Sequence, residues 1–93
     1  MATMKRLECG TAYITLTHDE LCAYNGLSES VCDFCIHPLS DFPEITLVPI
    51  LNQALCPKCW DKYKRTARRW PEDEPIEVRR EEYYKRVFNI KEA

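Results

Sequence analysis

The sequence has few of the features that common enzyme classes require. It contains only two glycines, so it lacks a glycine-rich loop of the kind that cradles phosphate groups. It also offers no recognisable pairing of a nucleophile with a base and no pair of catalytic carboxylates. From these absences we expect a non-enzymatic protein that has no small-molecule substrate.

Long apolar runs are also missing. The longest, residues 45–51, is interrupted by Thr46 and Pro49 and is far too short to cross a bilayer. Residues 1–6 lack the apolar segment of a signal peptide. We therefore expect no membrane partner and a cytoplasmic location, where thiols stay reduced and paired cysteines are more often metal ligands than disulfides. The alternative of a secreted, disulfide-bonded protein lacks its export signal.

Charge is distributed unevenly along the chain, whose formal net charge is −2. Residues 1–56 hold two basic and seven acidic side chains, whereas residues 57–70 hold six basic side chains and one acidic side chain. Residues 71–93 are mixed, with five basic and seven acidic side chains. The overall charge argues against indiscriminate nucleic-acid binding, but a local basic face remains possible.

The strongest signal is a pair of Cys-x-x-Cys motifs. Cys32 and Cys35 form the first, and Cys56 and Cys59 follow after 20 intervening residues. Two such pairs at this separation indicate one tetrahedral site of four thiolates, for which Zn²⁺ is the usual ion. A four-cysteine cage has no open position for water or substrate. We therefore predict one zinc ion per chain, with a structural role.

Local patterns predict several short elements. Residues 12–16 alternate apolar and polar side chains, as a half-buried strand does. Thr17 and Glu20 fit a capping box, which predicts a short helix over residues 18–24. Two roles for residues 1–27 stay open: they add a strand to the sheet, or they form an arm that binds a partner.

A β-hairpin is expected between the two cysteine pairs. Residues 45–48 read as a strand. Because proline cannot donate a ladder hydrogen bond, Pro49 places that strand at an edge or gives it a bulge there. A tight turn at Asn52 and Gln53 then delivers Cys56.

Two helices are predicted in the C-terminal half. Pro57 suits the first turn of a helix that we expect to run to Arg69, and a second helix is expected after the acidic turn at residues 72–75. Each carries an apolar stripe. The stripe of the first helix comprises Cys56, Trp60, Tyr63, Ala67 and Trp70. That of the second comprises Ile76, Tyr83, Val87 and Ile90 and is widened by Tyr84 and Phe88. We expect the helices to pack as a hairpin.

The order of knuckle, hairpin and helix with the last two cysteines in its first turn resembles a treble-clef zinc finger. The resemblance covers residues 32–70. It extends to GATA-type fingers, although Lys58 stands where that pattern has alanine. The sequence is also similar to the zinc-binding domain of the ClpX unfoldase, which has an aromatic residue inside its first knuckle, as Phe34 is here. DksA/TraR-type fingers resemble residues 49–59.

The resemblance implies an α+β fold and two kinds of partner. GATA-type fingers read DNA with the helix after the second pair, whereas the ClpX domain binds proteins and dimerises and DksA/TraR-type fingers bind RNA polymerase. We divide the expected single domain, residues 1–93, into an N-terminal strand and helix (1–27), the zinc treble clef (28–70) and an acidic turn with an amphipathic helix (71–93).

Three functional hypotheses follow. The first is a protein-binding adaptor or homodimer. The second is nucleic-acid binding through Lys58, Lys62, Arg65 and Arg69, which share the helix face opposite the apolar stripe; any soluble helix also places charges there. The third is a thiol redox protein, since a Cys-Pro-Lys-Cys motif at a helix start resembles a thiol–disulfide exchange site.

Two cysteines and two histidines lie outside the four-cysteine motif. His18 and Cys22 are four residues apart on the short predicted helix, so with Cys9 or His37 they form a candidate second metal site. His37 is also a candidate replacement for one cysteine of the first site. The alternative is a small buried cysteine beside a surface histidine.

Overall fold

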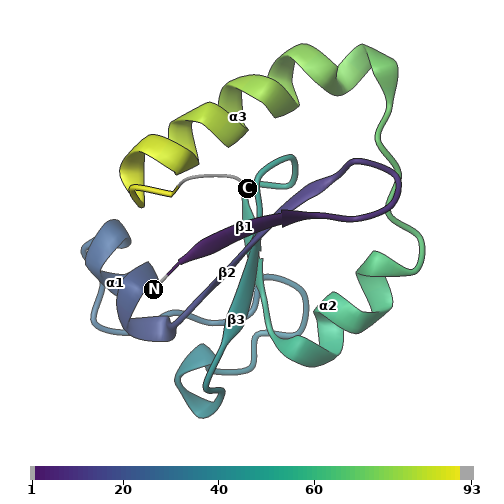
Figure 1. Ribbon diagram of the computed structural model, residues 1–93. Coiled ribbons are helices and arrows are strands. Elements are labelled where there is room, and N and C mark those ends of the chain that lie inside the picture. The colour runs from purple at the N-terminus through teal and green to yellow at the C-terminus, as the bar shows by residue number, and fades with distance from the viewer. Residues whose placement is uncertain (1, 91–93) are drawn as a thin grey trace.

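The computed structural model describes residues 2–90, which form an α+β fold of one antiparallel sheet, three α-helices and two short 3₁₀ helices (Figure 1). The elements in chain order are β1 (Thr3–Arg6), β2 (Ala12–Leu16), α1 (His18–Asn25), η1 (Leu39–Asp41), β3 (Ile45–Val48), β4 (Gln53–Leu55), α2 (Pro57–Lys64), η2 (Pro71–Asp73) and α3 (Glu74–Val87). No helix in this part of the chain combines the length and the apolar character needed to cross a bilayer.

The N-terminal segment belongs to the sheet. The strand order is β1-β2-β3-β4. Strands β1 and β2 form one hairpin and β3 and β4 form another, and the two hairpins are joined by antiparallel pairing of β2 with β3, for example Ile14 with Leu47. Of the two roles left open for residues 1–27, the structure shows added strands. The sequence pattern did not predict β1, because Met4 is the only one of its four side chains that is buried.

Strand β3 lies inside the sheet, so the prediction of an edge strand is wrong. All four of its residues are buried, and it pairs with β2 on one side and β4 on the other. Pro49 causes no conflict because it follows the last paired residue, Val48. It begins a turn in which the Asn52 N–H donates to Val48 O at 2.8 Å. Since Val48 pairs with Gln53, the loop spans residues 49–52 and is longer than the two-residue turn that we predicted.

Helix α1 begins and ends close to the predicted residues. The Thr17 hydroxyl accepts a hydrogen bond from the Glu20 N–H at 3.2 Å, and the Glu20 carboxylate accepts one from the Thr17 N–H at 2.9 Å. Gly26 ends the helix with φ 72°, and its N–H donates to Cys22 O. The capping box is therefore confirmed.

The predicted helical hairpin does not form. Helix α2 ends at Lys64, five residues before the expected end, and α3 lies apart from it at the other side of the sheet (Figure 1). Trp60 packs on Tyr13 of β2, with ring centroids 4.7 Å apart. Trp70 lies in the segment between α2 and η2, residues 65–70, which we call the linker, and is 52 % exposed. The apolar side of α2 therefore packs against the sheet and not against α3.

Helix α3 is rotated away from the predicted orientation. Tyr84 is buried and Phe88 half-buried, and both contact the ring of Tyr24 on α1, with centroids 6.0 and 5.2 Å away. This rotation leaves Ile76, Tyr83 and Val87 between 39 % and 46 % exposed. Of the narrow stripe predicted for this helix, Ile90 alone is buried. The aromatic contacts with α1 thus outweigh burial of the aliphatic stripe.

The same rotation buries two carboxylates, Glu77 and Glu81, which are only 2 % and 3 % exposed. Arg6 of β1 reaches Glu81 Oε1 at 2.7 Å. From the linker, Arg69 lies 3.1 Å from Glu77 Oε2 and 3.7 Å from Glu81 Oε2. We call these four residues the arginine–glutamate network. Because both acids have cationic partners, a polar helix face can be buried here.

Gly10 completes this network. Its carbonyl oxygen accepts hydrogen bonds from Arg6 Nη1 at 3.1 Å and Arg69 Nη1 at 2.9 Å. The residue has φ +98°, and a Cβ at this position would lie 3.2 Å from Arg69 Cδ. Glycine is required both for the backbone conformation and for the close approach of the arginine. The network therefore joins the β1–β2 turn, the linker and α3.

We expect Glu81→Gln to lower the free energy of unfolding by about 1–2 kcal/mol, because it removes the anion that two partly exposed guanidinium groups share. The control is Glu82→Gln, one residue away, whose side chain is 65 % exposed and pairs with Lys85. Its effect should stay within roughly 0.5 kcal/mol. Urea unfolding of the two variants measures the difference, and equal effects would contradict a stabilising network.

Candidate metal centre

The first cysteine pair lies on a tight turn between two paired segments. The Cys32 N–H donates to His37 O at 2.9 Å and the Leu39 N–H to Ser30 O at 3.0 Å. The Ile36 N–H closes the turn on Cys32 O at 2.8 Å. The two side chains of the pair therefore project from one rigid turn, as metal-binding knuckles require.

The second cysteine pair is delivered by β4 and the first turn of α2. Cys56 is the N-cap residue of α2, Pro57 follows in the first helical position, and Cys59 lies in the first turn. A proline is well placed here because its missing N–H would have no partner inside the helix. The sequence therefore sets both positions by local rules.

These elements bring all four cysteines together. The Sγ atoms of Cys32, Cys35, Cys56 and Cys59 lie within 4.8 Å of one another. Cys35 Sγ and Cys56 Sγ are 3.7 Å apart, close to the edge of about 3.8 Å for a tetrahedron with metal–sulfur distances of about 2.3 Å. A disulfide would bring the sulfurs to about 2.05 Å. The cluster is thus close enough to bind one metal ion, and its geometry suits zinc.

Asp33 holds the first pair against the strand that leads to the second. Its N–H donates to Ala54 O at 3.0 Å, and its carboxylate Oδ2 accepts from the Ala54 N–H at 2.8 Å. This contact covers the free edge of β4. We did not predict it from the sequence, although aspartate is a residue whose carboxylate often bonds nearby backbone N–H groups.

Cys32 and Cys59 differ in acidity because their surroundings differ. Burial raises the pKa of Cys32, but hydrogen bonds from the N–H groups of Cys56, Cys35 and Phe34 outweigh it and lower that pKa to about 7. Burial, with hydrogen bonds from the neighbouring sulfurs, raises the pKa of Cys59 to about 12. A divalent cation is what favours four thiolates in such a site, so metal binding releases protons.

Ile36 ends the knuckle in an unusual conformation. Its φ is +66°, a region that β-branched residues rarely adopt. Its side chain is 72 % exposed, so packing does not compensate. Strain of this kind persists where the surrounding structure fixes the backbone, and here the hydrogen bond from its N–H to Cys32 O does so.

The other candidate ligands are dispersed. His18 Nε2 lies 3.3 Å from Cys22 Sγ, so the predicted pair does share a helix face, but that nitrogen also accepts the Ser30 N–H at 3.1 Å. Cys9 Sγ contacts the Thr11 hydroxyl at 3.3 Å, and His37 Nε2 pairs with Asp41 at 2.8 Å. Within residues 2–90, the four-cysteine cluster is the only group of three or more potential ligands.

The basic residues of the predicted nucleic-acid face separate into two groups. Lys58, Lys62 and Arg65 are exposed on or just after α2. Arg69 instead belongs to the arginine–glutamate network and is only 20 % exposed. Three of the four residues thus remain available to a ligand.

We expect Ile36→Gly to raise the free energy of unfolding by about 0.5–1 kcal/mol, because it removes the cost of positive φ for a side chain, partly offset by the greater freedom of glycine in the unfolded chain. Ile36→Ala keeps the positive-φ cost and serves as the control. Denaturant unfolding of the metal-loaded protein compares the two. If alanine stabilises as much as glycine, the gain comes from losing an exposed apolar side chain rather than from relieving strain.

Comparisons of the chain with models of known protein families, with curated proteins and with solved structures found no match.

Proposed function

We propose that this protein is a non-enzymatic interaction module whose fold is held together by one zinc ion in a treble-clef arrangement. The observation that carries the proposal is the convergence of the four Sγ atoms within 4.8 Å. Four thiolates complete the coordination of zinc and leave no position for water or substrate. Such a site supports structure, and it requires a reducing compartment such as the cytoplasm.

The order of elements supports the treble-clef assignment. The knuckle at Cys32 and Cys35 is followed by the β3–β4 hairpin, and α2 supplies Cys56 and Cys59 from its N-cap and first turn. The same convergence weakens the redox hypothesis, since a working dithiol pair does not need two further thiols at metal-binding distance.

A protein partner or a second copy of the chain is favoured by the exposed apolar side chains. On α3, Ile76, Tyr83 and Val87 share one face because they recur at helical spacing. The large apolar side chains that are exposed in residues 2–90 are Leu27, Val31, Phe34, Ile36, Trp70, Ile76, Val78, Tyr83 and Val87. Single exposed apolar residues are ordinary. Groups of them on a small protein are typical of interaction surfaces.

Native mass spectrometry of untagged protein tests the zinc assignment. We expect one zinc ion per chain, retained in Cys9→Ser and Cys22→Ser and lost in Cys56→Ser. Zinc affinity should fall as the pH is lowered, because protons compete for the thiolates. A strong chelator should abolish the folded circular dichroism spectrum. A metal-free chain that keeps this spectrum would contradict the proposal.

Nucleic-acid binding is the second candidate, supported by the exposure of Lys58, Lys62 and Arg65. It predicts an affinity for single- or double-stranded oligonucleotides that falls steeply with salt. Lys62→Glu combined with Arg65→Glu should weaken binding at least tenfold, while Arg79→Glu combined with Arg86→Glu, two exposed positions on α3, serves as a charge-matched control. Fluorescence anisotropy at two salt concentrations measures both, and equal losses in the two proteins would exclude a specific face on α2.

A further inference from the structure

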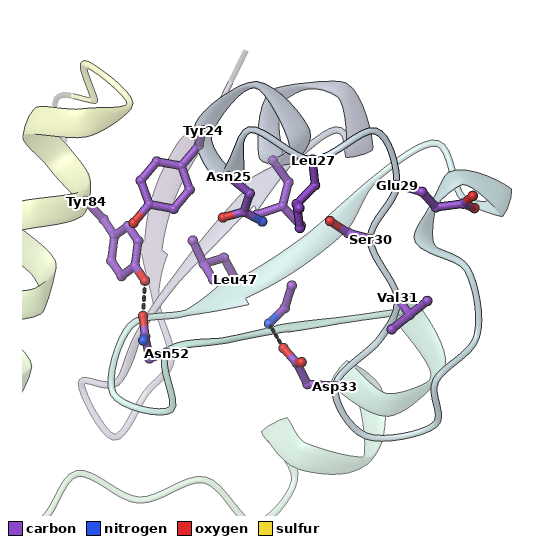
Figure 2. Close-up of a pocket in the computed structure, with 12 residues that line it drawn as sticks. Tyr24, Asn25, Leu27, Glu29, Ser30, Val31, Asp33, Leu47, Asn52 and Tyr84 are labelled. Carbon is purple, nitrogen blue, oxygen red and sulfur yellow. Dashed lines mark hydrogen bonds between the residues drawn. The ribbon is translucent and has the colours of Figure 1, made fainter.

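A pocket of about 400 Å³ opens between α1, the loop at residues 27–31, the β3–β4 hairpin and α3 (Figure 2). Its volume lies in the range of sites that hold small molecules or single side chains of a partner. Leu21, Leu47 and Ala54 supply apolar lining, and all three are buried. The metal-site knuckle contributes Asp33 to the same lining.

Two tyrosines form one wall of this pocket. Tyr24 and Tyr84 lie with ring centroids 6.0 Å apart at an interplanar angle of 65°. Their hydroxyls are engaged with other residues, Tyr84 donating to Asn52 Oδ1 and Tyr24 bonding the Tyr83 hydroxyl at 2.9 Å. What the wall offers is therefore aromatic surface, which attracts cations and planar groups.

The charge around the pocket has one sign. Glu29 and Asp33 line it, and none of its lining residues is lysine or arginine. Between Arg6 and Lys58 the sequence contains no lysine or arginine at all. On α3, one turn before Tyr84, Arg80 directs its guanidinium to the carbonyl oxygens of Pro49 and Ile50. The pocket is thus complementary to a cation.

Asp33 is a pre-organised acceptor for such a cation. Oδ2 is fixed by the Ala54 N–H, and within residues 2–90 the other carboxylate oxygen, Oδ1, has no hydrogen bond. Glu29 lies at the far end of the lining from the tyrosines, where its carboxylate accepts a hydrogen bond from the Ser40 hydroxyl and points away from the pocket (Figure 2). The amide of Asn25, beside Tyr24, adds a neutral acceptor (Figure 2). Acceptors held in place before binding lose little entropy when the ligand arrives.

We infer that this pocket binds an arginine side chain of a partner polypeptide. The aliphatic stem of arginine matches the apolar floor, and its flat guanidinium is suited both to stacking on a tyrosine ring and to donating hydrogen bonds to the Asp33 carboxylate and the Asn25 amide oxygen. The inference deepens the proposed interaction function by naming what the partner presents. It depends on the metal centre because the knuckle sets the position of Asp33.

The test is titration of ¹⁵N-labelled, zinc-loaded protein with the capped tripeptide Gly-Arg-Gly, followed by amide chemical shifts. We expect saturable shifts confined to residues 24–33 and 52–54. The capped citrulline tripeptide, which has the same shape without the charge, should bind at least tenfold more weakly. Asp33→Asn keeps an acceptor for the Ala54 N–H and should weaken arginine binding about tenfold. Asn25→Ala, which removes the amide acceptor without touching the knuckle, provides a second variant that should also weaken arginine binding.

The control variant is Glu44→Gln, an exposed acid outside the pocket, which should change the affinity less than twofold. Equal binding of the citrulline peptide, equal binding of a Gly-Lys-Gly peptide, or shifts that map onto α2 would each overturn the inference. Zinc content measured on the same samples separates the two proposals. Zinc-loaded protein without arginine binding refutes the pocket alone, whereas folded protein without zinc refutes the metal centre as well.

Discussion

The contact on which the rest of this structure depends is the closure of four sulfur atoms between the knuckle and the start of α2. The strands are only three to five residues long, and a chain of this size buries too little apolar surface to be more than marginally stable. A bound structural zinc ion contributes on the order of 10 kcal/mol in small zinc peptides. The same contact holds the knuckle beside β4, where Asp33 forms hydrogen bonds with Ala54 at the edge of the sheet. The proposed zinc centre would therefore stabilise residues 30–64 and fix the shape of the surface beside them.

A second set of constraints does not involve the four cysteines. The arginine–glutamate network joins the β1–β2 turn, the linker and α3. In addition, the rings of Tyr84 and Phe88 contact the ring of Tyr24 on α1. Arg69 Nε is near Glu77 Oε2, but the pair is not aligned as a hydrogen bond, and burial raises the pKa of Glu77 in spite of the nearby Arg69 charge. Buried ion pairs of this kind fix an orientation more than they add stability. Their consequence is that α3 turns its aliphatic side chains outward.

The difference between local and long-range contacts explains which parts of the fold could be predicted from the sequence. Features encoded by neighbouring residues were predicted well: the Thr17 capping box, the start of α2 at Pro57, the strand at residues 45–48 and the four clustered cysteines. Features decided by distant residues were not. The rotation of α3 depends on Arg6 and Arg69, which lie far from Glu77 and Glu81 in the chain, and no periodicity of the helix itself reports those partners. Asp33 is a similar case, because its function in the knuckle becomes visible only when Ala54 is placed beside it.

The separation of charge along the chain becomes a separation in space. Residues 7–57 contain no lysine or arginine, and they supply all but one of the residues around the pocket, the exception being Tyr84. The basic side chains Lys58, Lys62 and Arg65, which follow in the sequence, lie on or just after α2. Arg69 belongs to the arginine–glutamate network. An acidic, aromatic pocket and a basic helix therefore flank one knuckle. Asp33 belongs to both the knuckle and the pocket. The proposed zinc ion would therefore also hold in place a carboxylate that is fixed to the sheet and still has an oxygen available for the proposed partner.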